Sequence, residues 1–551
     1  MIKDAAASSP RASPDVFGEP KKTQGFQPSD CTQQDPSFFV PSEQSQWISV
    51  LSTPCPYPAV HFHTVMENLL RNPNVTSTHL FRAEILYDSD SDGSDYQPIR
   101  LIDQLRGFAW RRTVVRKLIP RNPNLDRPLP QTCHYFHSSS AGIKQDAAQQ
   151  PSDQKEGESN LVIYLPHVSD PSLMPFYHPQ ASAVATLHAF DQHSSRGSLS
   201  IHYRPFPSQE PGSSSDLGAG LSDRLSRTAL HLLQVIHKHM AGRAAGYTKR
   251  VHHDQIIPQT RLQDTYTRLK LKYAKYLITQ WVESTDPSKH VFEDLGIAAF
   301  LIELWRDMYG PDREHWKGFV DVGCGNGVLV YILRSEGYTG WGFDARRRKT
   351  WSALGEDLQS YLKEMVLIPE PMQHKTTDRY PTDIPRSELV DKIETHDGQF
   401  PEGTFIISNH ADELTLWTPL LACLTNSPFI AIPCCSHNFD GARFRAPANR
   451  AKDKKKAKDP GQPSAYASLC EYLSWLTAHI GYEAENEVLR IPSTRNTAIL
   501  GRTRTAEPRP LDERRQAVMK VVEGEVSVSI HEVHEKWVSR MGGIIKKPCG
   551  H

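Results

Sequence analysis

The sequence predicts an α/β fold whose second half forms a mainly parallel sheet, with helical elements before this sheet and an irregular α+β region at the N-terminus. From residue 319 onward, short apolar runs alternate with helix-periodic segments, which is typical of parallel strands joined by helices. A glycine-rich turn at residues 323–327 follows the first run and precedes a helix. The last two runs, residues 487–491 and 497–501, flank a five-residue turn, which indicates an antiparallel edge.

Composition bounds the architecture and the class of protein. A chain of 551 residues is long enough for three to four domains at about 150 residues each. The 63 basic and 63 acidic side chains balance, so any nucleic-acid-binding surface must be local. Nine cysteines without a C-x-x-C pair indicate neither a disulfide framework nor a zinc site, and favour a reducing compartment. No window approaches 18 consecutive apolar residues, so we expect no membrane span.

The N-terminal part divides into a polar start and a mixed region. Residues 1–37 are rich in Ser, Pro, Ala, Lys and Asp, lack a secretory signal, and are predicted to be disordered. Residues 38–220 hold short apolar or alternating runs such as 108–118, which predict an α+β region. The acidic tract 88–95 and the polar stretch 138–160 interrupt this region and are too hydrophilic to fold alone.

Residues 221–290 are predicted to form a helical segment that links the domains or faces RNA. An apolar stripe predicts one helix over residues 223–240. A second helix, over residues 262–282, carries apolar and aromatic residues on one side and lysines and arginines elsewhere. The stretch 247–254 between these helices fits a solvated linker and an RNA contact equally well.

Residues 291–504 are predicted to hold the parallel sheet. An apolar helix at residues 293–308 leads to the strand 319–322, and the strand 340–343 ends at Asp344. Further strands are expected at residues 405–408 and 429–432, and further helices at residues 414–424 and 471–480.

A basic insertion and a tail complete this part of the chain. Residues 441–462 include five lysines and few apolar residues, which predicts a basic flexible loop. Such a loop near an active site can hold phosphates, and a solvated insertion without a partner is the alternative. Residues 505–551 are expected to form a C-terminal tail.

The turn after the first strand of the sheet predicts the cofactor. Gly323, Gly325 and Gly327 supply dihedrals that other residues avoid and let a ligand approach the main chain. Asp344 ends the second strand, where a carboxylate can bond ribose hydroxyls. Asp321 precedes the first glycine by two residues, and an anion there would oppose a pyrophosphate but suit the cationic methionyl end of S-adenosylmethionine. We therefore expect S-adenosylmethionine, with an ordinary glycine turn as the alternative.

Several phrases of the second half occur together: V-H-H-D around His252, F-V-D-V-G-C-G-N-G, G-F-D-A-R-R-R-K-T-W, S-N-H-A-D-E-L-T, I-P-C-C and R-I-P-S-T. In this combination the chain resembles the eukaryotic tRNA(Ser) uridine-44 2′-O-methyltransferases. The resemblance covers residues 243–504 closely and residues 119–133 more faintly.

The resemblance implies a class I (Rossmann-like) methyltransferase sheet and a cytoplasmic enzyme. The implied activity is S-adenosylmethionine-dependent 2′-O-methylation of the ribose of uridine 44 in tRNA(Ser). The implied partner is a tRNA, serine-specific by resemblance. No membrane partner is expected. The resemblance leaves open whether an accessory protein is needed.

The loop after the fourth strand of a class I sheet faces the transferred methyl group, and here that loop contains residues 409–413. We expect Asp412 to accept the hydroxyl proton or orient the hydroxyl, with His410 and Glu413 as competitors. The alternative for Asp412 and Glu413 is capping of the helix that is expected to begin near residue 414. The alternative for His410 is a satisfied packing histidine.

Other residues around this site receive more limited roles. Asn409 opens the catalytic loop and is expected to contact the cofactor, and Asp397 is expected to contact adenine. The basic cluster 346–349 follows Asp344 almost directly, so RNA phosphates and helix solvation both explain it. For Arg490 and Arg495, an RNA contact and a solvated surface position fit the sequence equally well.

No metal site is expected. Cys434 and Cys435 follow the fifth strand and are interpreted as buried packing residues, because methyl transfer to oxygen requires no covalent enzyme adduct. Some relatives carry a C-terminal Cys/His zinc module. Here a single cysteine, Cys549, stands with nearby histidines, and this matches no common zinc module.

Two other functions fit parts of the sequence. One is a methyltransferase that acts on protein or a small molecule, and the requirement for RNA and its 2′-hydroxyl would distinguish it. The other is a non-catalytic RNA-binding protein that keeps the methyltransferase fold. Cofactor binding without transfer to any RNA would favour this second alternative.

Overall fold

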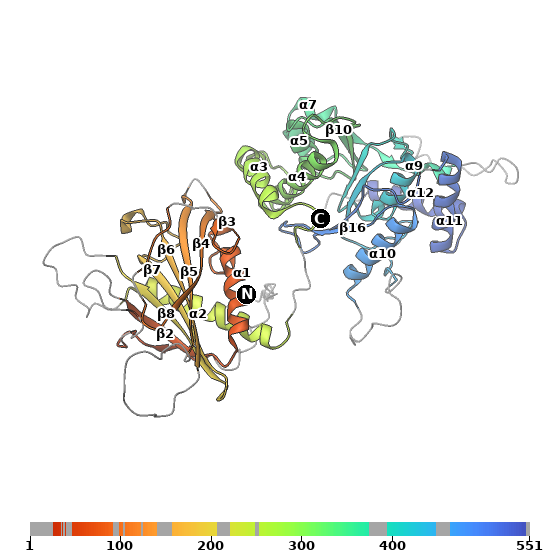
Figure 1. The fold of residues 1–551 in the computed structure, drawn as a ribbon. Coiled ribbons are helices and arrows are strands. Elements are labelled where there is room, and N and C mark those ends of the chain that lie inside the picture. Colours follow the sequence, from red (N-terminus) through yellow and green to blue (C-terminus); the bar gives the residue numbers. More distant parts are fainter. Residues whose placement is uncertain are drawn as a thin grey trace, which may run out of the picture. The chain divides into compact units, whose positions relative to one another are not determined.

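The computed structural model describes most of the chain, in two compact units that comprise Met1–Thr248 and Lys249–His551 (Figure 1). The described residues are 26–34, 36, 39, 47–91, 98–102, 105–122, 125–139, 157–206, 221–247, 253–373, 394–447, 463–507 and 509–546. Some of the predicted segments fall outside them: most of the disordered start 1–37, the polar stretch 140–156, residues 248–252, the lysines of the basic loop 441–462, and Cys549.

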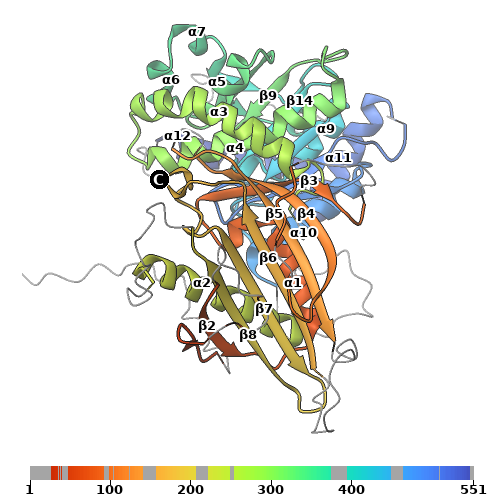
Figure 2. The same ribbon diagram turned by 60° about the vertical axis from the view of Figure 1, so that its left-hand side comes forward.

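The N-terminal unit is built on one eight-stranded antiparallel sheet in the order β1-β2-β8-β7-β6-β5-β4-β3. Figures 1 and 2 show its long strands side by side. The strands are β1 (Ser29–Asp30), β2 (Ile48–Pro54), β3 (Leu80–Asp88), β4 (Ala109–Pro120), β5 (Leu129–Ser139), β6 (Gly157–Pro166), β7 (Ala183–Asp191) and β8 (Arg196–Arg204). The α+β prediction holds for this unit, but the region is a regular sheet rather than an irregular one.

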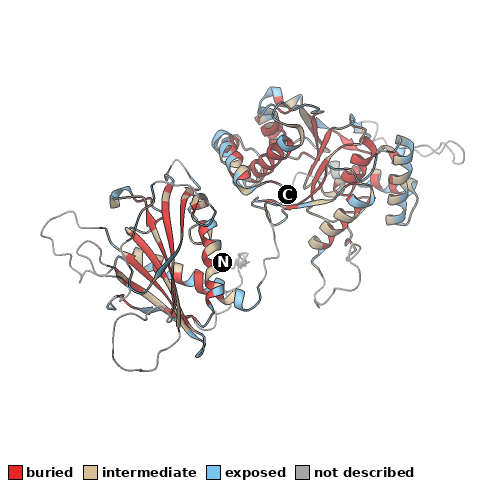
Figure 3. Cartoon of the chain, in the orientation of Figure 1, coloured by how far each residue is buried: buried red, intermediate tan, exposed pale blue. Residues whose placement is uncertain are grey.

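Both faces of this sheet are covered. The helices α1 (Ala59–Arg71) and α2 (Asp223–Ala244) contact each other and pack on one face. The alternation of β6 explains the two faces, because Val162 belongs to the core under these helices while Leu161 and Ile163 pack with Phe39 and Trp47. Figure 3 shows the resulting burial of the inner strands.

The helical segment expected at residues 221–290 is divided between the two units. Ser222 caps α2 by accepting a hydrogen bond from the Leu225 N–H at 3.4 Å, and α2 packs in the N-terminal unit. The next helix, α3 (Gln259–Thr279), packs on α4 (Pro287–Tyr309) in the C-terminal unit. The prediction missed this division because both helices are amphipathic and the pattern does not reveal which core each one covers.

The C-terminal unit holds a seven-stranded sheet in the order β11-β10-β9-β14-β15-β17-β16. The first five strands in this order run parallel, and β17 is antiparallel to both of its neighbours. Its pairing with β16 is the antiparallel pair that the sequence predicted. The strands are β9 (Phe319–Val322), β10 (Gly340–Asp344), β11 (Leu362–Glu364), β14 (Phe405–Asn409), β15 (Phe429–Ile432), β16 (Glu485–Val488) and β17 (Thr497–Gly501).

Helices cover both faces of this parallel sheet. Phe319 of β9 and Ile407 of β14 point to the core with α3, α4 and α5 (Val328–Ser335). Their neighbours Val320 and Ile406 point to the opposite core with α9 (Trp417–Thr425) and α10 (Ala465–His479). The shorter elements are η1 (Pro73–Val75), η3 (Pro171–Leu173), α6 (Thr350–Ala353), α7 (Glu356–Gln359), β12 (Val366–Leu367), α8 (Glu370–Gln373), β13 (Thr395–His396) and η5 (Asp412–Leu414).

The segment expected as a C-terminal tail instead forms two helices, α11 (Leu511–Val526) and α12 (Ile530–Lys546). Val518 and Val522 of α11 and Val533 and Trp537 of α12 are fully buried, each pair at helical i, i+4 spacing. The Trp537 indole N–H donates to the Leu367 carbonyl at 2.8 Å. The last helices therefore belong to the core of the C-terminal unit. Among the described residues, no helix is long and apolar enough to cross a membrane.

Candidate functional site

A cavity of about 550 Å³ opens at the carboxyl ends of three adjacent parallel strands of the C-terminal unit. In the sheet, β9 lies between β10 and β14. The strand order reverses at this position, and ligands of open α/β sheets bind at such switch points. The cavity volume lies in the usual range of small-molecule sites, about 300–1,000 Å³.

The three glycines after β9 differ in what surrounds them, although all have positive φ, +75°, +52° and +77°. A Cβ on Gly323 would lie 3.0 Å from the Ala411 Cβ, so this glycine allows the loop after β14 to approach. A Cβ on Gly325 would meet nothing within 4 Å, because Gly325 faces the cavity. Gly327 packs under Leu362 at the start of α5 and does not line the cavity. Only the first two glycines therefore border the site.

Asp344, at the end of β10, lies at the cavity wall with a fixed carboxylate. Its Oδ2 accepts a hydrogen bond from the Gly325 N–H at 3.0 Å, and its Oδ1 accepts one from the Arg346 N–H at 3.1 Å. These two main-chain donors connect the glycine turn to the second strand. Each carboxylate oxygen keeps a lone pair for a ligand hydroxyl.

Asp321 is a buried carboxyl group at the cavity wall. The residue is 1% exposed, and its Oδ1 has no hydrogen-bond partner. Burial, and to a lesser degree the negative charge of Asp344, raises the pKa of Asp321 to about 8. Buried polar atoms are almost always hydrogen-bonded, so an unpartnered oxygen at a cavity points to a missing cationic or donor ligand.

A second buried carboxyl group stands beside the first. Asp294, on α4, is 6% exposed, and burial together with the charges of Glu293 and Asp321 raises its pKa well above the ordinary value. The Asn409 side-chain amide donates to its Oδ1 at 3.4 Å. Carboxyl groups thus gather at the cavity wall, where a positive charge would relieve their mutual repulsion.

His410, Asp412 and Glu413 all line the cavity on the loop after β14. The His410 Nε2 lies 2.8 Å from the Glu293 Oε1, while its buried Nδ1 has no hydrogen-bond partner. His410 and Asp412 adopt positive φ, +52° and +42°, an uncommon conformation for residues other than glycine. The Glu413 Oε1 lies 4.0 Å from the His437 Nε2.

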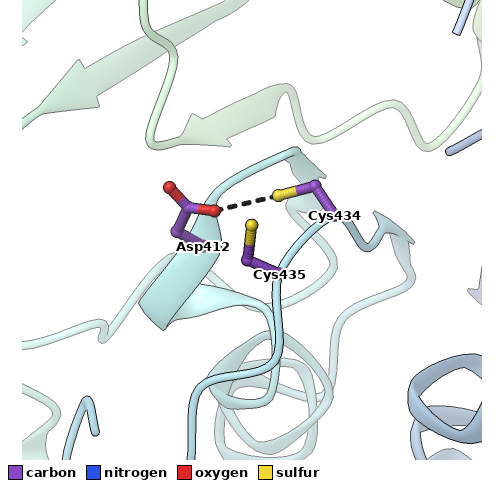
Figure 4. A group of neighbouring side chains, drawn as sticks. All are labelled: Asp412, Cys434 and Cys435. Carbon is purple, nitrogen blue, oxygen red and sulfur yellow. Dashed lines mark hydrogen bonds between the residues drawn. The ribbon is translucent and has the colours of Figure 1, made fainter. Parts of the chain in front are cut away.

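Asp412 meets the cysteine pair that follows β15. The Cys434 thiol donates to the Asp412 Oδ1 at 2.9 Å, and the Cys435 sulfur lies on the same side (Figure 4). Burial, with the charge of Asp412 second, raises the pKa of both thiols. Both cysteines are free and half-buried, so the interpretation of this pair as buried packing residues is wrong.

The helix-capping alternative for Asp412 and Glu413 does not hold. The helix after the loop, α9, begins at Trp417, and its N-cap residue is Leu416, which makes no side-chain cap bond. The short η5 turn likewise has no side-chain cap. Asp412 and Glu413 therefore remain available for the cavity.

Asp397 lies outside the cavity lining. Its side chain is 49% exposed, and its Oδ1 accepts a hydrogen bond from the Gln399 N–H at 2.9 Å within a turn. The cavity lining includes the apolar residues Phe343, Met365 and Val366. Spacing alone placed Asp397 at the site, and the chain turns away before reaching it.

The basic residues near the cavity fall into two groups. Arg346, Arg348 and Arg495 line the cavity. Arg347 instead donates to the Gln359 side chain at 2.7 Å, and Arg490 donates to both carboxylate oxygens of Asp254 at 2.9 and 2.5 Å. The first group therefore brings positively charged side chains to the cavity wall.

The sequence analysis missed the contribution of α4 to the site. Glu293 and Asp294 line the cavity, and so does His290 one turn before them. The signal was two adjacent carboxylates within a helix whose following residues are almost all apolar and buried. Carboxylates are rarely buried without a partner, so this pattern indicates a polar site inside a helical core.

Two family models match the chain. Residues 24–250 match a model described as "TRM44-like, N-terminal bet v1-like domain", and residues 256–369 match one described as "Predicted AdoMet-dependent methyltransferase".

Curated fungal proteins match over most of the chain, and each is named tRNA (uracil-O(2)-)-methyltransferase. The Neurospora crassa protein is 48% identical over 484 residues, which cover 85% of this chain and 89% of the relative. The Aspergillus oryzae protein is 41% identical, with 79% of this chain and 78% of the relative covered. The Saccharomyces cerevisiae protein is 36% identical, with 83% and 87% covered.

Proposed function

The chain belongs to the family of tRNA (uracil-O(2)-)-methyltransferases, and we propose on this premise that it methylates the ribose 2′-hydroxyl of a uridine in tRNA, with S-adenosylmethionine as methyl donor. The single structural observation that carries the proposal is the buried Asp321 carboxyl group at the cavity wall, whose Oδ1 has no hydrogen-bond partner. We propose further that the substrate is uridine 44 of tRNA(Ser), as the sequence resemblance implies.

We propose that the C-terminal unit is a class I, Rossmann-like methyltransferase domain. Five parallel strands, with the order reversed beside β9 and an antiparallel β17 inserted between β15 and β16, support this assignment. The match of residues 256–369 to a methyltransferase family supports it independently.

The residues of the cavity fit S-adenosylmethionine. When bound, this cofactor supplies a methyl group on a positively charged sulfur. Asp321 and Asp294 offer buried negative charge to the cationic methionyl end. Asp344 is placed to accept hydrogen bonds from ribose hydroxyls, and the open space at Gly325 lets a ligand approach the main chain.

The apolar side of the cavity fits the adenine ring. Phe343, Met365, Val366 and Leu367 line it with hydrophobic surface. Cofactor sites are mostly apolar with a few polar groups that fix orientation, and this side matches that pattern. Asp397 has no part in this proposal.

We propose His410 as the acceptor of the hydroxyl proton. If the Nε2–H of a neutral imidazole donates to Glu293 across the 2.8 Å contact, the unpartnered Nδ1 carries the lone pair that takes a proton. Glu293 then acts as a positioning residue that fixes the tautomer. Asp412 keeps the role of orienting the hydroxyl, and Glu413 is the alternative residue for that role.

Binding of a tRNA requires positively charged side chains that contact its phosphates near the cavity. Arg346, Arg348 and Arg495 are such side chains, and we propose that they contact phosphates on either side of the target nucleotide. We also propose that the protein acts in the cytoplasm, which the eight free cysteines of the described residues support, since such thiols persist in a reducing compartment.

The test is methyl transfer from labelled S-adenosylmethionine to unmodified tRNA(Ser), mapped by nuclease digestion and mass spectrometry. We expect one 2′-O-methyluridine at position 44. The matched control is the same tRNA with a 2′-deoxyuridine at that position, which should receive no label. Label on the deoxy control, or label only on protein, would contradict the proposal and favour a different methyl acceptor.

A further inference from the structure

Three potential metal ligands converge beside the cavity. The Asp412 carboxylate and the Cys434 and Cys435 sulfurs offer ligand atoms within 4.8 Å of one another (Figure 4). Among the residues that the structure describes, no other group of three or more His, Cys, Asp or Glu side chains is arranged in this way. Asp412 and Cys434 also line the cavity, so the group lies at its wall.

The backbone turns these three side chains toward one point. Neighbouring side chains of an extended strand point to opposite sides, but Cys434 and Cys435 follow the end of β15 and both face Asp412. Asp412 itself has φ +42°, which costs conformational energy for a residue with a Cβ. Such backbone strain persists where the surrounding structure or a ligand stabilises it.

The ligand types select the metal. Thiolates prefer Zn²⁺ to hard ions such as Mg²⁺ or Ca²⁺, and carboxylates also bind Zn²⁺. With bond lengths of about 2.3 Å to sulfur and about 2.0 Å to oxygen, ligand atoms around a tetrahedral ion lie about 3.3–3.8 Å apart. The three ligand atoms lie within 4.8 Å of one another, so side-chain adjustments of about 1 Å bring them to this geometry. Zinc sites with three protein ligands keep the fourth position for water or substrate.

We propose that Asp412, Cys434 and Cys435 bind one Zn²⁺ ion whose fourth coordination position faces the cavity. This inference deepens the proposed function and, in its catalytic part, rests on it. The fourth position would hold the ribose 2′-oxygen and favour loss of its proton to His410. The oxygen then bonds the methyl carbon as the carbon–sulfur bond breaks, and the sulfur leaves as a neutral thioether. Asp412 thereby orients the hydroxyl through the ion.

The first test measures the site without reference to activity. The full-length chain is purified under reducing conditions, loaded with Zn²⁺ or Co²⁺, and dialysed. We expect one Zn²⁺ per chain, and with Co²⁺ a sulfur-to-cobalt charge-transfer band. Cys434→Ser and Cys435→Ser should each weaken the band strongly, and the double variant should abolish it. Retention of no metal by the wild-type chain would overturn the proposal.

Two matched variants control for other cysteines. Cys470, half-buried on α10, is outside the cluster, and Cys549 comes two residues before His551 in the sequence. Cys470→Ser and Cys549→Ser should keep the full band. A band that survives the Cys434/Cys435 double variant but disappears in Cys549→Ser would place the metal elsewhere and overturn the site.

A third measurement needs no variant and so avoids any loss of folding. Zn²⁺ should protect Cys434 and Cys435 of the wild-type chain from alkylation, as quantified by peptide mass spectrometry. A chelator should remove this protection and leave the alkylation of Cys470 unchanged. Equal alkylation of the pair with and without Zn²⁺ would contradict metal binding.

The catalytic part is separated from the proposed function by measuring cofactor binding and methyl transfer on the same samples. We expect the metal-free chain to bind S-adenosylmethionine normally and to methylate tRNA at least tenfold more slowly than the zinc-loaded chain. Equal rates would refute the role of the ion at the hydroxyl and leave the proposed function intact. No methylation by either form, with Zn²⁺ bound, would refute the proposed function and leave the site intact.

Discussion

Two buried ionisable sites, one in each unit, differ in whether their polar atoms have partners. In the N-terminal unit, Arg116 is 7% exposed, and its guanidinium donates to the Gln131 side chain and to the Leu69 and Leu70 carbonyls at 2.7–3.0 Å. In the C-terminal unit, Asp321 and Asp294 are similarly buried, yet they repel each other and one Asp321 oxygen has no partner. A buried charge with partners stabilises a core, whereas a buried charge without them marks a ligand site.

The largest expected effect concerns methyl transfer at the cavity of the C-terminal unit. His410→Ala should lower methyl transfer to tRNA by about 10²–10⁴-fold, the usual contribution of general acid–base catalysis, with cofactor affinity near wild type. Glu293→Gln should cause a smaller loss, because it removes the charge that fixes the imidazole. The readout is single-turnover transfer of labelled methyl. Wild-type turnover in His410→Ala would return the role of proton acceptor to Asp412 or Glu413.

The next effect concerns cofactor affinity. Asp321→Asn should weaken S-adenosylmethionine binding by about 10²–10³-fold, since one charge pair at about 5 Å is worth about 3–4 kcal/mol at an effective dielectric constant of 20. Isothermal titration calorimetry measures this loss. Asp397→Asn is the matched control, because Asp397 lies outside the cavity, and it should bind normally.

The same variant should stabilise the free chain. Asp321 has a raised pKa, about 8 against an ordinary 3.8, so the folded state holds a proton that the unfolded state has lost. Stability therefore falls as pH rises from about 4 to 8, and the asparagine removes this loss. Thermal unfolding at pH 8 should show a higher Tm for Asp321→Asn than for wild type. A lower Tm would indicate a structural role for the carboxylate.

The N-terminal unit should show the reverse behaviour. Arg116→Met leaves the Gln131 side-chain oxygen and two buried carbonyls without a donor, which should cost about 2–3 kcal/mol of unfolding free energy. Urea unfolding measures the loss, and S-adenosylmethionine affinity at low temperature should not change. A loss of cofactor affinity without loss of stability would break the contrast between the two units.

The smallest effect lies at the mouth of the cavity. The double variant Arg346→Ala/Arg348→Ala should weaken tRNA binding and reduce the slope of log K against log salt by about 0.7–0.9 for each phosphate that the variant no longer neutralises. Arg347→Ala is the matched control, since Arg347 bonds Gln359 instead of lining the cavity. Equal slopes for wild type and the double variant would remove these arginines from the RNA surface.

The parallel sheet was predictable because its signals are local. The strands Phe319–Val322 and Phe429–Ile432 match their predicted bounds, since each is a short apolar run between polar, Gly or Pro residues. Gly323 and Gly325 line the cavity, because a glycine turn after a strand leaves few arrangements. The sequence thus predicted those elements whose backbone conformation is determined by neighbouring residues.

The remainder depends on contacts between distant segments. Asp412 meets Cys434 across 22 residues, and His410 meets Glu293 across 117 residues, so no spacing rule connects them. The regular eight-stranded form of the N-terminal sheet was missed within the predicted α+β region, because its strands carry buried polar residues such as Arg116 and His202, which obscure the alternation of apolar residues. Trp537 was assigned to a tail, although Val533, Trp537 and Met541 follow one another at helical i, i+4 spacing and are buried.

The most direct measurement of the central claim is the proton balance of S-adenosylmethionine binding. Calorimetric titrations at pH 7 in buffers of different ionisation enthalpy give the number of protons released. Because Asp321 is mostly protonated in the free chain at this pH, a cation that binds beside it should expel close to one proton. Identical binding heats in all buffers, with wild-type affinity in Asp321→Asn, would contradict the claim that this carboxylate receives the cofactor's positive charge.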